Sequence, residues 1–387
     1  MFARSMNRMH SRSPSRSSTI LPDKQQQICG GIVQTTLTSN GRVIDEHPTK
    51  FGRLRESSEH VADGTVLRER LSEDGYVFLR DVLDKQLLLH VQEVISDELH
   101  RLDAIDPEGD RSAHLFPARP GLSLYKVADN ISQEERHALT RQPALHAIFH
   151  AIFGEEAKSL DYSWPRIAGP GRSEQPHCDW VFMRRGTPRL YTAWIPLMDL
   201  PLSHGPLMVL ENSHHDNPHT RRYLRMDADK LGYFDAARFK HGALVHGGCY
   251  SRRPDRVREE FGTRWLSTDY RLGDVIIFST RALHATLDNR SKGFRMSIDA
   301  RFQPAGDVTD PRFVGPHPIA HSARDTNIFT HARQVTGRQA DGLTALRDKW
   351  SLQGHDGVLR YLGRRRPRRA DGRAAGIGEI GAPRTAS

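Results

Sequence analysis

The chain has 387 residues, of which 37% are hydrophobic and 27% charged, so it can build a buried core and is not a wholly disordered protein. No apolar run approaches the roughly 18 residues that a membrane-spanning helix requires, which excludes an integral membrane protein. The three cysteines (Cys29, Cys178 and Cys249) are too few and too scattered for a disulfide framework or a cysteine-rich zinc site.

The net charge of +9 comes from the two ends of the chain. Residues 1–22 contain four arginines and no acid, and residues 364–387 contain seven arginines and two acids, so the ends account for the whole excess. A globular nucleic-acid-binding protein usually carries its basic residues on the fold itself, and the rest of this chain is neutral by count. We therefore expect no specific nucleic-acid partner.

Residues 1–60 are polar and weakly patterned, and we expect them to be disordered or weakly ordered. The first 22 residues, rich in Ser and Arg, have the composition of a mitochondrial transit peptide. A disordered leader, or a start codon assigned too far upstream, explains the same composition and is favoured. Since no apolar secretory segment follows, we expect a cytoplasmic protein.

Helical patterns dominate the chain from residue 61 to residue 153. Residues 65–71 are typical of a short helix, and residues 76–79 of a strand. Apolar residues between 87 and 102 recur at steps of three and four, which predicts an amphipathic helix. A second helical stretch is expected over residues 133–153.

After Gly154 the pattern changes to short strands separated by turn-forming residues, from residue 164 to residue 304. In the last of them, apolar residues at 296, 298, 300 and 302 alternate with polar ones, so one face is buried and the other polar. A long charged insertion, residues 215–265, interrupts the strands, and we expect it to cover a site. The order of helices and then strands predicts an α+β domain over residues 61–310, followed by an extension, 311–363, and a disordered basic tail, 364–387.

The motif His177-Cys178-Asp179 has the spacing of a metal site. On a strand, residues i and i+2 point to the same face, so the imidazole and the carboxylate could hold one ion, and Cys178 would point away and serve packing. The apolar run at 180–183 is what a strand would show. A rival with the same spacing, His214-His215-Asp216, lies in a run of turn-forming residues that lacks this rigid geometry.

A second histidine and an arginine complete the candidate site. His284 follows an apolar strand at 275–278, and Arg295 opens the last strand. Two histidines and one carboxylate are the ligand set of non-haem Fe(II) oxygenases, and an arginine fork suits a carboxylate-bearing cosubstrate. Taken singly, His284 is more often an ordinary turn histidine and Arg295 more often a surface cation. Their occurrence together and in this order favours the site.

Residues 65–305 resemble the phytanoyl-CoA dioxygenase family of Fe(II)- and 2-oxoglutarate-dependent oxygenases. The resemblance is carried by His177 and Asp179, by His284, and by further matched segments: Lys126-Val127-Ala128-Asp129, Trp194-Ile195-Pro196-Leu197-Met198-Asp199, and Gly205-Pro206-Leu207 continuing to Ser213-His214. In the last of these, Glu211-Asn212 replaces the family's Pro-Gly. This placement makes His214 a turn landmark and disfavours the rival motif.

The resemblance implies a double-stranded β-helix core (jelly roll, cupin-like) flanked by helices. It implies that His177, Asp179 and His284 bind Fe(II), and that Arg295 binds 2-oxoglutarate, helped by Thr286 and Lys126. Trp194 is a further candidate for the cofactor site. With O2, such an enzyme would hydroxylate or otherwise oxidise an unactivated C–H bond of a small or medium organic metabolite, releasing succinate and CO2.

Two other function classes remain open from the residues. One is a cupin-like metal-dependent isomerase or hydrolase that does not use 2-oxoglutarate, in which Arg295 and Thr286 would have no set role. The other is a non-catalytic binding module. Halogenation is disfavoured because related halogenases lack the carboxylate that Asp179 supplies. The sequence leaves the substrate and the oligomeric state unassigned.

Overall fold

The computed structural model describes residues 36–106, 108, 131–228, 248–316, 318 and 320. The leader, the basic tail, the middle of the insertion and Lys126 lie outside these residues. Within the described ranges no helix has the length and apolarity to cross a membrane.

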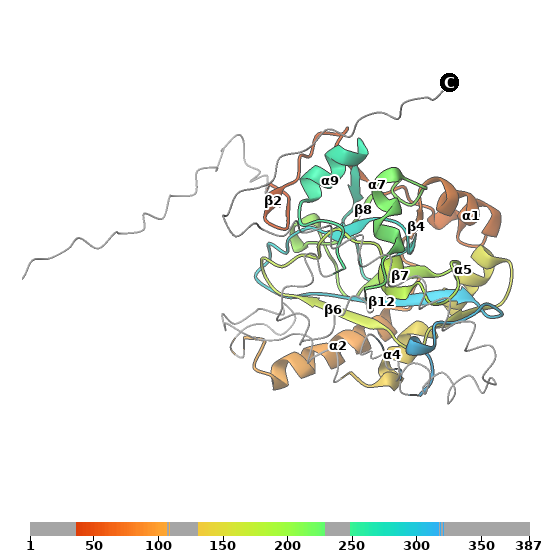
Figure 1. Cartoon of the computed structure of the whole chain (residues 1–387). Coiled ribbons are helices and arrows are strands. Elements are labelled where there is room, and N and C mark those ends of the chain that lie inside the picture. The colour runs from red at the N-terminus through yellow and green to blue at the C-terminus, as the bar shows by residue number, and fades with distance from the viewer. Residues whose placement is uncertain are drawn as a thin grey trace, which may run out of the picture. The chain divides into compact units, whose positions relative to one another are not determined.

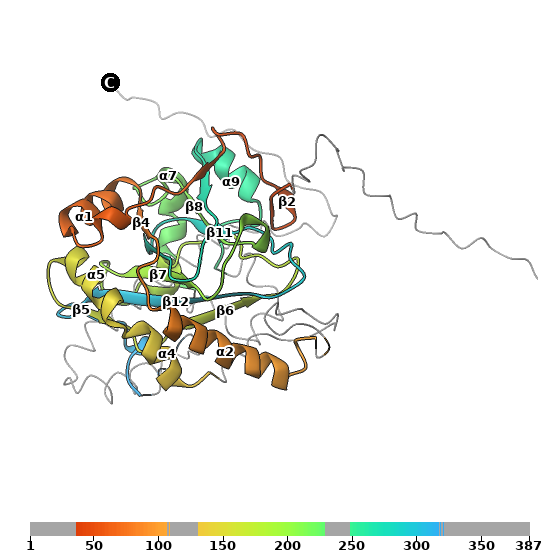
Figure 2. The same cartoon turned by 180° about the vertical axis from the view of Figure 1, so that it is seen from behind.

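Two β-sheets, whose strands pair mostly antiparallel, form the body of the domain (Figures 1 and 2). The larger, six-stranded sheet has the order β4-β10-β7-β12-β5, with β6 also paired to β12. Its strands are β4 (Tyr76–Leu79), β5 (Ala157–Ser159), β6 (Trp164–Ala168), β7 (Tyr191–Pro196), β10 (Val275–Ser279) and β12 (Arg295–Pro304). The smaller, four-stranded sheet has the order β11-β8-β9-β3, with the strands β3 (Phe51–Arg53), β8 (Leu207–Leu210), β9 (Trp265–Ser267) and β11 (His284–Thr286). A two-stranded hairpin precedes both: β1 (Thr38–Ser39) and β2 (Arg42–Val43).

The helices divide between the outer faces of the two sheets, as Figures 1 and 2 show. The larger sheet is covered by α1 (Gly64–Glu73), α2 (Lys85–Arg101), α4 (Gln133–Thr140) and α5 (Pro143–Phe153). Residues of α6 (Trp180–Met183) and α9 (Pro254–Phe261) pack in the core of the smaller sheet. The short helix α7 (Pro218–Arg221) lies in the insertion between β8 and α9. Single 3₁₀ turns occupy Ser58–His60, Leu202–His204, Tyr223–Arg225 and Pro311–Phe313.

The alternation of side chains along each strand sorts the core into layers. On β10, Val275 and Ile277 pack under the helices, whereas Ile276 and Phe278 pack between the sheets against residues of β8 and β9. Both faces of the larger sheet are therefore buried, and the space between the sheets is the interior of a double-stranded β-helix. This is the α+β architecture that the sequence predicted.

The polar face of β12 lies in this interior rather than in solvent. Met296, Ile298 and their alternate neighbours pack under the helices, and all ten residues of the strand are buried. Arg295, Ser297, Asp299 and Arg301 thus line the space between the sheets. A buried polar row of this kind marks a site, because buried polar groups need partners.

Several local predictions hold and others need correction. The strand at 76–79 and the helices near 65–71 and 87–102 form as predicted. The stretch 133–153 divides into α4 and α5, because Pro143 starts a new helix at its first turn. Ordered structure also begins earlier than residue 61, since β3 pairs in parallel with β9. The predicted insertion contributes the helices α7 and α9, and its last residue, Trp265, belongs to β9.

Candidate metal centre

The two candidate ligand histidines are paired through their own backbones. His177 and His284 form an antiparallel bridge, in which each backbone N–H donates to the other's carbonyl oxygen at 3.0 Å. The pairing brings their ring centroids to 4.2 Å. His284 reaches the interior because Leu283 and Ala285, its neighbours in the chain, pack on the opposite side.

Asp179 reaches the same point by a route that differs from the predicted one. Residues 180–183 form the short helix α6, not a strand, and Asp179 is its N-cap residue in a helical conformation. A short apolar run does not distinguish a strand from a buried helix. The carboxylate is brought to the histidines by the turn from the bridge into the helix. Cys178 packs in the outer core, as predicted, with its thiol 3.1 Å from the carbonyl oxygen of Arg281.

The hydrogen bonds of the rings leave the right atoms for a metal ion. The Nδ1 atoms of His177 and His284 donate to the carbonyl oxygens of Gln175 and Ala282, at 2.7 and 3.1 Å. Because a carbonyl oxygen can only accept, each Nε2 keeps its lone pair. Each Nε2 lies 3.8 Å from Oδ1 of Asp179, and the three atoms all lie within 4.8 Å of one another. Burial lowers the pKa of His284 to about 4, so the imidazole is in its neutral, coordinating form.

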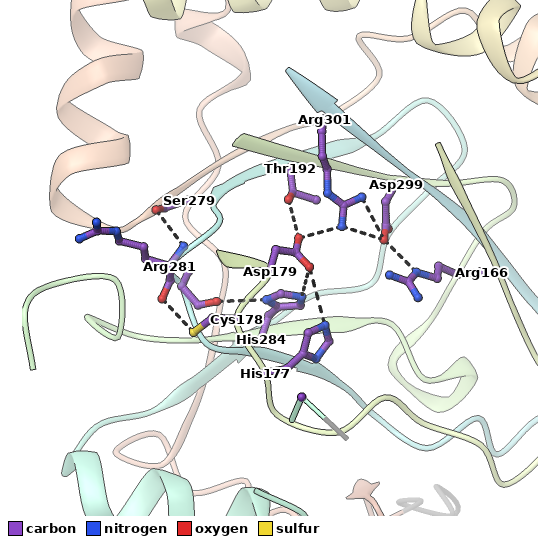
Figure 3. A network of polar contacts seen from close by, with 12 residues as sticks. Arg166, His177, Cys178, Asp179, Thr192, Ser279, Arg281, His284, Asp299 and Arg301 are labelled. Carbon is purple, nitrogen blue, oxygen red and sulfur yellow. Dashed lines mark hydrogen bonds and ion pairs between the residues drawn. The ribbon is translucent and has the colours of Figure 1, made fainter. Parts of the chain in front are cut away.

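The other oxygen of Asp179 is occupied by protein groups. Oδ2 accepts hydrogen bonds from Oγ1 of Thr192 at 2.6 Å and from a guanidinium N–H of Arg301 at 2.8 Å. Figure 3 shows these two partners on one side of the carboxylate and the two imidazoles on the other. Burial alone would raise the pKa of Asp179, but the Arg301 cation, together with the hydrogen bond from Thr192, outweighs it and holds that pKa well below its usual range.

Arg295 is a buried guanidinium with donors to spare. One N–H donates to the carbonyl oxygen of Gly205 at 2.8 Å, whereas Nε is buried without a hydrogen-bond partner among the described residues. Burial lowers the pKa of Arg295 to about 10, so it is still charged at neutral pH. An unsatisfied buried cation suits a carboxylate ligand, the group that 2-oxoglutarate would supply.

Thr286 and Trp194 also face the interior. Thr286 lies two residues from His284 on β11, and its hydroxyl oxygen accepts the backbone N–H of Glu174 at 2.7 Å, which leaves the hydroxyl proton to donate. Trp194 is 2% exposed and packs edge-to-face on Tyr270 in the apolar core between the sheets. The rival motif is dispersed: His214 bonds the carbonyl of Ser72, and Asp216 pairs with Arg221.

Four polar residues near Asp179 belong to the site although the sequence did not predict them as site residues. Two of them were noted only as part of the alternation along the last strand. The four are Arg166, Thr192, Asp299 and Arg301. Arg301 and Thr192 are cross-strand partners in the β12–β7 pairing, which puts both beside the carboxylate. Extending the two-residue period from Arg295 along the strand would have predicted Asp299 and Arg301 as interior residues.

Two imidazoles and a carboxylate that converge inside a double-stranded β-helix are the arrangement of a non-haem Fe(II) oxygenase. A model of the phytanoyl-CoA dioxygenase (PhyH) family matches residues 71–297. The chain belongs to this family. It is a 2-oxoglutarate-dependent non-haem iron dioxygenase, with Fe(II) and 2-oxoglutarate as cofactors.

Characterised relatives cover most of the chain. It is 28% identical over 280 residues to the 1-deoxypentalenic acid 11-beta-hydroxylase of Streptomyces exfoliatus, an alignment that covers 68% of this chain and 89% of that protein. It is 26% identical over 289 residues to the enzyme of the same name from Streptomyces arenae, covering 72% and 93%. Among solved structures, the epimerase SnoN in complex with Fe3+, α-ketoglutarate and nogalamycin RO is 16% identical, with a TM-score of 0.44 and coverage of 68% and 90%.

Proposed function

We propose that this enzyme hydroxylates, or otherwise oxidises, an unactivated C–H bond of a small or medium organic metabolite and releases succinate and CO2. One observation carries the proposal. Nε2 of His177, Nε2 of His284 and Oδ1 of Asp179 converge between the two sheets, and the same interior holds Arg295, a buried arginine whose Nε has no partner among the described residues.

In this proposal His177, Asp179 and His284 hold Fe(II), with the two imidazoles neutral and the carboxylate ionised. When it is bound, ferrous iron together with 2-oxoglutarate activates O2 for oxidation of a C–H bond. The protein positions the groups and excludes water: His284 is 5% exposed and Asp179 3% exposed. Asp179 fills the place that a halide would take, which favours hydroxylation over halogenation.

The far carboxylate of 2-oxoglutarate would be bound by Arg295, with Thr286 donating its hydroxyl proton to the same group. Gly205 helps, because its carbonyl oxygen fixes one edge of the guanidinium and leaves Nε free to donate. We propose cofactor-site roles for Trp194, as a wall of the interior, and for Lys126, on the family resemblance alone.

The strongest competing function is a metal-dependent isomerase or hydrolase that does not use 2-oxoglutarate. The Nε of Arg295, which has no partner within the part of the chain that the structure describes, favours the oxygenase, because the competing function has no set anion for this buried cation. The named relatives are hydroxylases of a carboxylic acid, so organic acids belong first among the substrates to be tried.

The test is an assay of succinate formation by the full chain with Fe(II), 2-oxoglutarate and O2 over a panel of metabolites. We expect one class of compound to raise succinate formation stoichiometrically with an oxidised product. The Asp179→Ala protein is the control and should give no product. Metabolite turnover that does not depend on 2-oxoglutarate would instead establish the competing function.

A further inference from the structure

We propose that Arg301 is a positioning residue of the metal centre, which holds Asp179 so that only Oδ1 is presented to the metal. The inference rests on the proposed role of Asp179 as a ligand. Its basis is that the two carboxylate oxygens of Asp179 have different partners. Oδ2 accepts hydrogen bonds from Arg301 and Thr192, and Oδ1 faces both histidines. A carboxylate with one oxygen engaged in this way cannot rotate freely.

Arg301 is itself fixed from three sides. Its side chain is 2% exposed, and its guanidinium carbon lies 4.3 Å from the centre of the Trp164 ring. Asp299 Oδ2 lies 3.4 Å from its nitrogens and also accepts a hydrogen bond from Nε of Arg166 at 2.8 Å. Figure 3 shows the resulting row: Asp179, Arg301, Asp299 and Arg166. Residues that bond to a metal ligand, but not to the metal itself, set the orientation of that ligand.

The strand pairing explains how the fold supplies this device. Arg301 stands opposite Thr192, and Asp299 stands opposite both Trp194 on β7 and Trp164 on β6. The two-residue period places Arg301 on the same interior face as Arg295. One strand therefore carries both the arginine proposed for the cosubstrate and the arginine that holds the metal carboxylate.

A purely electrostatic role and a positioning role of Arg301 predict opposite changes in metal affinity when the side chain is removed. A guanidinium near a divalent cation repels it, so a purely electrostatic role predicts that the metal would bind more tightly without Arg301. A positioning role predicts weaker binding, because Asp179 loses the partner that holds Oδ2 and orients the carboxylate, while Asp299 keeps its ion pair with Arg166. The sign of the change therefore separates the two.

The experiment is titration of the metal-free full chain with Co(II), followed by visible absorption, which reports the ligand set directly and needs no turnover. We expect Arg301→Met to weaken Co(II) binding by about 10- to 100-fold and to change the visible spectrum. Arg301→Lys keeps the charge and one contact, and should weaken Co(II) binding less than Arg301→Met does. Arg312→Met is the matched control: it removes another fully buried arginine, which pairs with Asp310, and should leave the Co(II) spectrum unchanged.

Unchanged or tighter Co(II) binding by folded Arg301→Met, with the wild-type spectrum, would overturn the proposal. So would an equal loss in Arg312→Met, which would show a general effect of destabilisation. If Arg301→Met does not fold, Asp299→Asn replaces it, with a spectral change and weaker binding expected and a wild-type titration counting against the proposal. A wild-type chain that fails to bind Co(II) would contradict the proposed metal site itself, a distinct result.

Discussion

His177 and His284 exchange both backbone hydrogen bonds with each other, so the two imidazoles proposed to bind iron sit on directly paired residues. His284 lies on β11, and the bridge ties His177, which lies outside the named strands, to that strand. Each ring is also fixed by a second hydrogen bond from Nδ1 to a carbonyl two residues earlier in the chain. The pairing sets the separation of the rings before any metal arrives, which is the preorganisation that a metal site needs.

Asp179→Ala should abolish tight metal binding. One of three ligands is lost, and Arg301 is left without the carboxylate that it holds, so we expect the Fe(II) or Co(II) affinity to fall by at least about 100-fold. Isothermal titration under anaerobic conditions measures this. The matched control is Asp216→Ala in the rival motif, an exposed carboxylate paired with Arg221, which should bind metal as the wild type does. Equal losses in both variants would contradict the assignment.

Arg295→Met should weaken 2-oxoglutarate binding far more than metal binding. Loss of a hydrogen bond to a charged group costs about 1.5–3 kcal/mol, so the dissociation constant of 2-oxoglutarate should rise by roughly 10- to 150-fold. The Fe(II) affinity should change by less than about threefold, because Arg295 has no contact with the three ligands in the described structure. Arg290→Met, an exposed arginine that bonds the carbonyl of Thr36, is the control and should leave both affinities intact.

Gly205→Ala should destabilise the protein and disturb cosubstrate binding together. Gly205 has a φ of +73°, and a Cβ there would lie 2.5 Å from the carbonyl oxygen of Leu287. We expect a loss of about 2–4 kcal/mol in the free energy of unfolding, measured by urea denaturation, because both backbone strain and a clash are introduced. Gly306→Ala, where a Cβ meets nothing within 4 Å, should change stability by less than about 0.5 kcal/mol. Similar losses at the two positions would refute the explanation.

Cys249 should react slowly with iodoacetamide in the folded protein. Burial raises the pKa of its thiol to about 11, and the thiolate is the reactive form. Near pH 8 only about one thiol in a thousand is ionised, and each unit of pH toward 11 should raise the labelling rate by about tenfold while the fold persists. Peptide mapping by mass spectrometry reads Cys249 separately from the other cysteines. Labelling as fast as that of an unfolded control would contradict the burial.

The sequence predicted which side chains converge at the site better than it predicted the secondary structure that carries them. The spacing of His177 and Asp179 predicted one metal-binding pair, and the fold does bring them together. The predicted strand was wrong because an apolar run of four buried residues is equally compatible with a helical turn, and the packing around α6 decides. Long-range pairing, such as that of His177 with His284, has no local signature.

The substituted turn shows what the residues do encode. In Glu211-Asn212, which replaces Pro-Gly, Asn212 has a φ of +61°. Asn is the residue other than Gly that most readily adopts this conformation, so the departure from the family pattern keeps the turn. In contrast, the role of Arg301 was missed because alternation along β12 does not tell whether the polar side faces water or a second sheet.

The interior face of β12 has a consequence for how this enzyme has to be stabilised. Nε of Arg295, Oγ of Ser297, Oδ1 of Asp299 and Nε of Arg301 are all buried without hydrogen-bond partners among the described residues. Replacing these side chains with valine and leucine would give a more stable protein that has lost its activity. The apolar contacts between the other face of β12 and the helices must therefore supply the stability that the polar face does not. Stability and reactivity thus depend on opposite faces of the same strand.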